Sequence, residues 1–152
     1  MVRAGAGIYG IEVVDDRTYG LEPAMTVTSR ISQLRTVSAG TPVGYNRSYV
    51  TTRAATLALV PIGYADGVPR ALSNRGCVAV NGVRCPIRGI VSMDQLIVDV
   101  THADAQLGDD VLVLGNGQDG ALTASEWARI AATIPHEILT GFGRRITRED
   151  QE

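Results

Sequence analysis

The chain has 152 residues, of which 45% are hydrophobic and 20% charged, and a formal net charge of −2 at pH 7. A chain of this length buries roughly 68–70% of its unfolded surface, enough for one stable domain. All 14 basic residues are arginine, so this chain alone supplies no Schiff-base amine and no neutral-lysine base. A biased codon composition, as in a GC-rich genome, would produce the same lack of lysine.

The arginines are dispersed rather than clustered, which argues against nucleic acid and membrane surfaces as partners. No apolar run approaches the roughly 20 residues that span a bilayer, and the amino terminus lacks the apolar core of a signal peptide. We therefore expect a cytoplasmic protein that binds a small molecule or another protein.

In chain order, residues 1–22 mix glycine with acidic and turn residues, and short β-type runs follow from residue 23 onward. We place a domain boundary at this change, with a second unit over 23–152. Many short strands separated by turn residues predict a mainly β domain, a barrel or a sandwich. The expected strands are 25–37, 56–62, 77–80, 83–87, 96–100 and 111–114.

The dipeptide Asn81-Gly82 lies inside alternating apolar sequence, the pattern of a two-residue hairpin turn. In that register Cys85 sits opposite Val78, and Cys77 points to the other face of the ribbon. We therefore expect no disulfide. With no CxxC pair and only two histidines, we also expect no metal site.

One helix is predicted, near 123–132. Thr123 and Glu126 have the spacing of a capping box, and apolar residues follow at helical intervals. Pro135 should end this helix, because proline disfavours helical dihedral angles in the residue before it. Residues 138–148 are expected to form one more strand and a frayed end.

Few residues point to chemistry by pattern alone. Gly5, Gly7 and Gly10 could aim backbone N–H groups at a phosphate, although a plain turn would have the same composition. Tyr45 and Tyr64 fall in turns, where tyrosines usually serve as amphipathic surface residues.

Seven segments occur together in the order found in alanine racemase, and the similarity extends over essentially the whole chain. The chain resembles the carboxy-terminal β-barrel-like domain of that family, preceded in 1–22 by a short remnant of its (β/α)₈ barrel. The segments are RAGAGIYG (3–10), MTVTSRI (25–31), VGY (43–45), PIGYADG (61–67), VNG (80–82), VSMDQ (91–95) and HEILT (136–140).

The resemblance implies a pyridoxal phosphate enzyme that interconverts L- and D-alanine and supplies D-alanine for peptidoglycan. Two bases exchange the Cα proton: a barrel lysine that carries the cofactor, and a tyrosine from the other subunit of a head-to-tail homodimer. Tyr45 matches that tyrosine. Arg3 matches the arginine facing the pyridine nitrogen, and its permanent charge cannot accept the ring proton. Gly5 and Ala6 match backbone donors to the cofactor phosphate.

The resemblance also implies substrate contacts. Met93 matches a residue whose backbone N–H holds the substrate carboxylate across the dimer, with Asp94 beside it. Tyr64, Arg70 and Ile134 match residues of a narrow entrance to the active site. A narrow entrance suits a site that selects a methyl side chain and protects a carbanion from water.

Three positions depart from the family pattern. His136 stands where a tyrosine commonly reaches the phosphate and lines the substrate pocket, which makes serine or another small amino acid an alternative substrate. Arg88 precedes Gly89 and Ile90, whereas the family usually places the arginine after the glycine, so Arg88 either serves the entrance from one step away or the charge is lost. Asn46 replaces a glycine and tolerates left-handed dihedral angles.

The barrel and its lysine are absent from this sequence, so the isolated chain is expected to be inactive. The alternative from a different class is a β module for dimerisation or ligand binding without catalysis.

Overall fold

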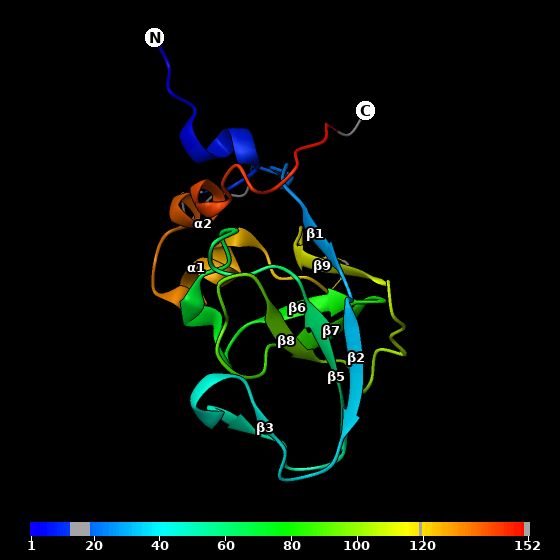
Figure 1. The fold of residues 1–152 in the computed structure, drawn as a ribbon. Helices are drawn as coiled ribbons and strands as arrows, with labels where there is room; N and C mark the ends of the chain where they lie inside the picture. Colours follow the sequence, from blue (N-terminus) through cyan, green and yellow to red (C-terminus); the bar gives the residue numbers. More distant parts are fainter. Residues whose placement is uncertain (13–18, 119, 151–152) are drawn as a thin grey trace.

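The computed structural model describes residues 1–12, 19–118 and 120–150 (Figure 1). Among these residues the fold is mainly β, as predicted, and it contains two α-helices where one was predicted. The strands are β1 Val27–Arg30, β2 Gln33–Val37, β3 Pro42–Val43, β4 Tyr49–Val50, β5 Ala55–Val60, β6 Cys77–Val80, β7 Val83–Pro86, β8 Leu96–Asp99 and β9 Asp110–Leu114. The helices are α1 Ala124–Ala131 and α2 Pro135–Gly141, with 3-10 turns η1 Gly5–Tyr9, η2 Tyr45–Arg47 and η3 Arg70–Leu72.

The strands form two antiparallel sheets, ordered β1-β9-β6-β7 and β2-β5-β8, and a separate β3–β4 pair. The prediction of one continuous strand over 25–37 is wrong, because the chain changes sheets after β1. There Ile31 N–H donates to the carbonyl of Asp109, the residue before β9, and Ser32 N–H donates to the carbonyl of Leu59 of β5. This crossing connects the two sheets into one folded unit.

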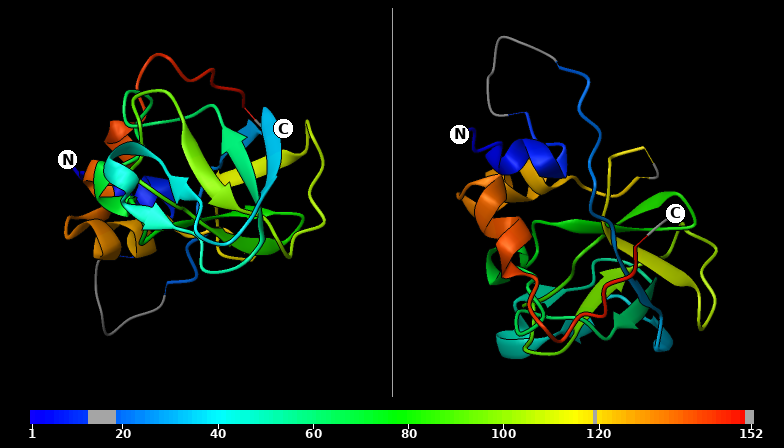
Figure 2. Two further views of the ribbon diagram at one scale, coloured as in Figure 1. Left: turned by 60° about the horizontal axis from the view of Figure 1, so that its bottom comes forward. Right: turned by 90° about the horizontal axis from the view of Figure 1, so that it is seen from above.

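The two helices lie beside η1 (Figures 1 and 2), and β3 lies at the opposite end of the molecule in the view of Figure 1. The core between them is aliphatic and includes the buried faces of both sheets. Trp127 of α1 is fully buried, with its ring centroid 6.1 Å from that of Phe142. Burial of one large aromatic side chain anchors α1 to the sheets.

The predicted hairpin is confirmed: Val80 pairs with Val83, and Cys85 lies opposite Val78. Cys77 and Cys85 are both free thiols. The capping box is also confirmed, since Thr123 accepts from Glu126 N–H and the glutamate carboxylate accepts from Thr123 N–H.

The predicted strand within 138–148 is wrong. Pro135 does not close α1, which ends at Ala131 and is followed by Ala132 in the left-handed conformation; Pro135 instead opens α2 at its first turn. Proline suits this place because the first N–H groups of a helix have no intrahelical acceptor and the fixed φ already matches a helix. The described residues after α2 contain no strand, and Arg148 there donates to the carbonyl of Phe142.

Candidate functional site

A cavity of about 570 Å³ gathers half of the predicted site residues. Three loops form its wall: the η2 turn, the turn after β5 and the loop before β8. Its lining residues are Tyr45, Asn46, Tyr64, Arg70, Ile90, Val91, Ser92, Met93 and Asp94. Two phenols, a guanidinium and a carboxylate therefore line one space, which has the size of a small-ligand pocket.

Tyr45 projects from the short β3–β4 hairpin, where it is 68% exposed. The next two residues, Asn46 and Arg47, have φ of 58° and 51°. The left-handed conformation predicted to be tolerable at Asn46 is thus adopted. Both residues lie in the turn between β3 and β4, which leaves the Tyr45 side chain exposed.

The turn after β5 is fixed to the loop that carries Met93. Tyr64 N–H donates to Ser92 and Ala65 N–H to Met93, both at 3.0 Å between N and O. Gly63 makes this approach possible, because a Cβ at its position would lie 2.3 Å from the Ser92 carbonyl oxygen. These two backbone bonds hold Tyr64 and Met93 on adjacent walls.

Arg145, which the sequence did not single out, clamps the same two loops from the carboxy-terminal segment. Its guanidinium lies 2.6 Å from the Asp94 carboxylate and 3.1 Å from that of Asp66. Asp66 is only 6% exposed and also accepts from Gly63 N–H. The hydrogen bond to Asp94 and the charge of Asp66 raise the pKa of the Arg145 guanidinium. In the sequence, only the presence of two acidic residues in separate turns suggests a basic partner. Nothing in the sequence indicates which arginine that partner is.

The other predicted residues do not line this cavity. Arg3, Gly5 and Ala6 lie at η1, whereas Ile134 caps the amino terminus of α2 and His136 lies in its first turn. The 3-10 turn η1 and α2 lie side by side in both orientations (Figures 1 and 2). The structure thus divides the predicted site residues into a cavity group and a group at the η1–α2 end.

The η1 turn presents unused backbone donors. Gly5 has φ of 57°, and Ala4 before it supplies no side-chain cap. Within the described residues, the N–H groups of Gly5 and Ala6 have no hydrogen-bond acceptor, although Ala6 is 4% exposed. Two adjacent free N–H groups at the start of a helical turn fit an anionic oxygen ligand such as a phosphate.

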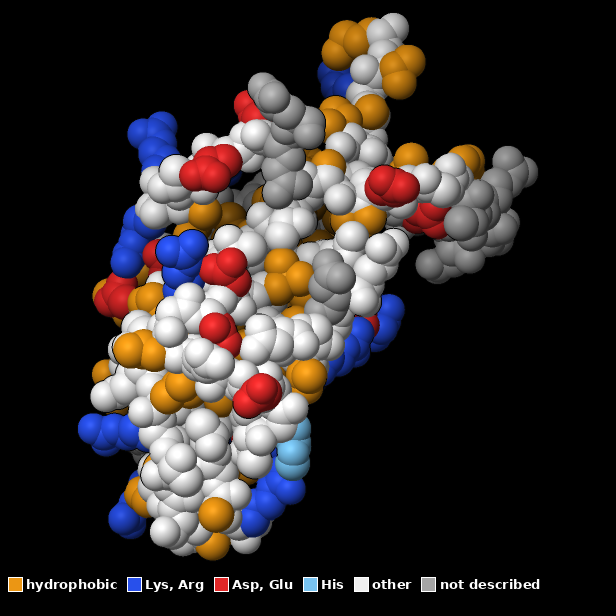
Figure 3. Space-filling model, turned by 90° about the vertical axis from the view of Figure 1, so that its right-hand side faces the viewer, with side chains coloured by type: hydrophobic (Ala, Val, Ile, Leu, Met, Phe, Trp, Pro, Cys, Tyr) orange, Lys and Arg blue, Asp and Glu red, His pale blue; other side chains and the backbone are white. Residues whose placement is uncertain are grey.

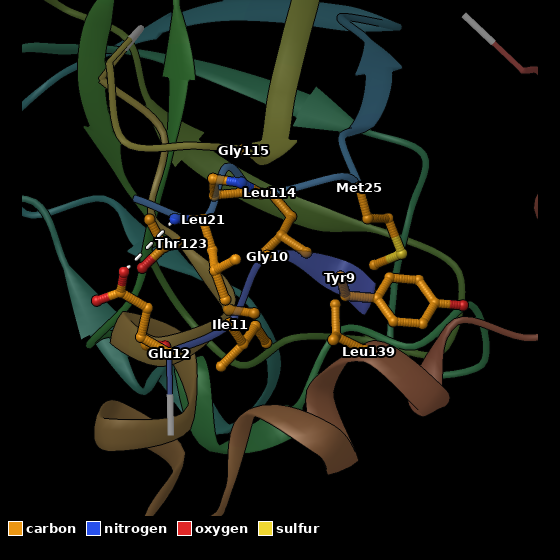
Figure 4. A pocket seen from close by; sticks show the side chains of 13 residues that line it. Tyr9, Gly10, Ile11, Glu12, Leu21, Met25, Leu114, Gly115, Thr123 and Leu139 are labelled. Atoms are coloured by element: carbon orange, nitrogen blue, oxygen red, sulfur yellow. Dashed lines mark hydrogen bonds between the residues drawn. The ribbon is translucent and has the colours of Figure 1, made fainter. Parts of the chain in front are cut away.

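A second hollow, of about 250 Å³, lies under η1 (Figure 4). Apolar side chains of η1, β9 and α2 surround it, among them Tyr9, Ile11, Leu114 and Leu139. Ala24 N–H also donates to the Tyr9 carbonyl. These contacts fasten η1 to the β domain and so fix its position relative to α2.

Arg88 lies away from the cavity. Its guanidinium carbon is 4.6 Å from the centre of the Tyr49 ring, and its Nε is 3.9 Å from Asp99. The alternation expected from a strand is interrupted because Gly89 has φ of 83°. Ile90, and not Arg88, lines the cavity, so the wall at this point is apolar.

The rest of the described surface gives no indication of a further type of binding site. Acidic and basic side chains are interspersed over the face seen in Figure 3, as the dispersed arginines predict. Among the described residues no group of three or more His, Cys, Asp or Glu side chains could hold a metal ion. Within the same ranges, no helix has both the length and the apolar character needed to cross a membrane.

Comparison with known proteins identifies the class. Residues 24–150 match the family model described as alanine racemase, C-terminal domain, so the chain belongs to this family. It is 44% identical over 143 residues to an alanine racemase of Salinispora arenicola, covering 94% of this chain and 38% of that protein. It is 46% identical over 151 residues to one from Mycolicibacterium vanbaalenii, covering 97% and 39%.

Solved structures agree with this assignment. Alanine racemase of Bartonella henselae with covalently bound pyridoxal phosphate superimposes with a TM-score of 0.88 at 42% identity, over 97% of this chain and 40% of that one. The biosynthetic alanine racemase of Pseudomonas aeruginosa gives 0.88 at 35% identity, over 97% and 41%. The chain thus spans about two fifths of the length of the relatives that it matches.

Proposed function

We propose that this chain is the carboxy-terminal part of a cytoplasmic, pyridoxal phosphate-dependent alanine racemase that acts as a homodimer and supplies D-alanine for peptidoglycan. Residues 23–152 would be its β domain, and residues 1–22 the end of its cofactor-binding barrel; positions 13–18, 119 and 151–152 of these two units lie outside the described residues. The observation that carries the proposal is the cavity that brings Tyr45, Tyr64 and Met93 together.

In this proposal Tyr45 moves a proton at its phenolic oxygen. An ordinary phenol, with a pKa of about 10, is a poor base at neutral pH and needs nearby positive charge. The resemblance puts the positive groups that serve this purpose largely on the barrel, outside this chain; Arg70 lines the cavity as a residue of its entrance. The exposed phenol, held on the turn between β3 and β4, would reach a substrate placed at the mouth of the cavity.

Met93 would bind the substrate carboxylate. Its N–H has no acceptor within the described residues, and its side chain is exposed, so a carboxylate oxygen can approach the amide. Asp94 forms an ion pair with Arg145. This pair would hold the loop that carries Met93, and the guanidinium would balance the charge of the Asp94 carboxylate. Tyr64 and Arg70 would narrow the access route, together with Ile134 from the α2 end.

The η1 end fits one part of the cofactor. The free N–H groups of Gly5 and Ala6 would hold its phosphate, His136 would donate to the same group, and Arg3 would face the ring nitrogen. When bound, pyridoxal phosphate supplies a conjugated ring that withdraws electrons from the substrate Cα. The amine that attaches it must come from another part of the protein, because this sequence contains no lysine.

Two experiments test the proposal. The purified 152-residue chain, given pyridoxal phosphate and L-alanine, should form no D-alanine; formation of D-alanine would overturn the claim that the chain alone is inactive. In a complete racemase that ends in this chain, Tyr45→Phe should abolish most of the turnover. Unchanged turnover would instead support the non-catalytic β module.

His136 favours a second candidate within the same chemistry, a racemase of serine or of broader specificity. An imidazole is smaller than a phenol and can donate a hydrogen bond to a substrate hydroxyl. In the complete protein, comparing kcat/KM for alanine and serine decides between the two, and His136→Tyr should shift the ratio toward alanine.

A further inference from the structure

We propose that Asn74 is a positioning residue for Tyr45: its side-chain amide ties the turn that carries the tyrosine to the loop that leads to Met93. Its catalytic consequence rests on the function proposed above. Asn74 follows η3 and lines none of the cavity itself.

Both ends of the Asn74 amide are used. Its Nδ2 donates to the Ser48 carbonyl at 3.1 Å, on the Tyr45 turn, and its Oδ1 accepts from Gly89 N–H at 2.6 Å. A carbonyl can only accept and an N–H can only donate, so a single orientation of the amide satisfies both partners. Asn74 has φ of 58°, a conformation that asparagine tolerates better than most residues.

The preceding residue extends the same connection. Ser73 Oγ accepts from Val91 N–H at 2.9 Å and donates to the carbonyl of Arg70 at 2.5 Å. The pair Ser73-Asn74 therefore touches each of three wall segments: the Tyr45 turn, the residue Arg70 and the stretch that runs into Met93. No other described pair of adjacent residues has side-chain hydrogen bonds to all three.

The backbones that Asn74 joins are in direct contact. A Cβ at Gly44 would lie 3.2 Å from Ile90 N, and one at Gly89 would lie 3.0 Å from the Val43 carbonyl oxygen. Such close packing leaves little room for sideways movement once the amide bridges the two strands of chain. The exposed phenol of Tyr45 makes few contacts of its own, so its position depends on the backbone beneath it.

Two substitutions separate the two hydrogen bonds. Asn74→Asp keeps the acceptor for Gly89 N–H and the tolerance of positive φ, but it places a carboxylate oxygen against the Ser48 carbonyl. Asn74→Gly removes both bonds and keeps the backbone conformation. Asn81→Gly is the matched control, because Asn81 has φ of 50° and sits at the distant hairpin tip.

Nuclear magnetic resonance of the 152-residue chain tests the connection without reference to any activity. Asn74→Asp should shift and broaden the backbone resonances of residues 44–49 while Gly89 N–H stays protected from exchange. Asn74→Gly should affect both regions, and Asn81→Gly neither. Unchanged resonances of 44–49 in Asn74→Asp would overturn the inference.

A double-mutant cycle in the complete racemase tests the catalytic consequence. Asn74→Asp should lower kcat about 10- to 100-fold, the range expected when a catalytic group is slightly misplaced, with KM changed less than twofold. In a Tyr45→Phe background the same substitution should lower kcat less than twofold, because the phenolic group that Asn74 positions is already absent.

The inference would be overturned if the kcat losses of the two single variants multiplied in the double variant, or if Asn74→Asp kept the full kcat. Full activity of Tyr45→Phe alone would refute the proposed function instead, and the resonance result would still decide whether Asn74 orders the turn. The two failures are therefore distinguishable.

Discussion

Gly63 offers the sharpest test of how the cavity wall is built. In Gly63→Ala the new Cβ would lie 2.3 Å from the Ser92 carbonyl oxygen and 2.4 Å from that of Met93. Both neighbours are backbone atoms, so no side-chain rotation relieves the overlap, and the two loops must separate. The φ of Gly63 is not positive, so the cost comes from the contact and not from backbone strain.

The magnitude follows from the bonds that join these loops. Separation weakens the hydrogen bonds from Tyr64 and Ala65 to the opposite loop, each worth about 1 kcal/mol net, and overpacking adds about 1–3 kcal/mol. We expect the free energy of unfolding to fall by about 3 kcal/mol. For a domain of this size the midpoint would fall by about 6–12 °C.

Urea and thermal unfolding of the 152-residue chain measure this loss. Gly143→Ala is the control, because a Cβ there meets no atom within 4 Å and its φ is not positive. The control should change the free energy of unfolding by less than about 0.5 kcal/mol. A Gly63→Ala loss no larger than that of the control would refute the reasoning.

Three further predictions concern other parts of the chain. Thr123→Ala should lower the free energy of unfolding by about 1 kcal/mol, because it removes the cap of α1; denaturant titration measures this, and no change would contradict the capping role. Burial raises the pKa of both thiols, that of Cys85 to about 11, and Cys85 is almost inaccessible to solvent, so at pH 8 iodoacetamide should modify the half-buried Cys77 first, as mass spectrometry of the peptides would show; faster labelling of Cys85 would contradict it. Arg145→Gln should release the carboxy-terminal segment and speed trypsin cleavage after Arg148 several-fold, and an unchanged rate would show that the two aspartates do not hold this segment.

Local sequence rules predicted the elements whose signals lie within a few residues. The Asn81-Gly82 turn fixed the register of β6 and β7, and the Thr123–Glu126 pair located α1. Both signals act through backbone geometry that neighbouring residues determine by themselves.

Errors arose where one residue allows two structures. Pro135 is compatible with the end of one helix and with the start of the next, and only the position of α2 against the core decides between them. The run 25–37 is uniformly β-like, and its division between two sheets depends on partners about 20 residues away for β2 and more than about 80 residues away for β1. Strand pairing with residues distant in the sequence cannot be recognised from the residues of the run itself.

The candidate site shows the same division. Resemblance to the family indicated Tyr45, Tyr64, Arg70 and Met93, which the structure places around one cavity. The bridging role of Arg145 was missed because its exposed side chain reaches Asp94, 51 positions earlier in the chain, and Asp66, which is earlier still. Surface ion pairs have no periodicity or spacing by which a sequence could reveal them.

The crossing at Ile31-Ser32 constrains how the chain can change length during evolution. Two residues separate β1 from β2, and each already gives its N–H to a different sheet. Side chains alternate along both strands, so inserting one residue here would turn Leu34, which packs against the main core, to the opposite face of β2. Homologous domains should therefore vary in length in their long loops and keep this linker constant, or change it by two residues at a time.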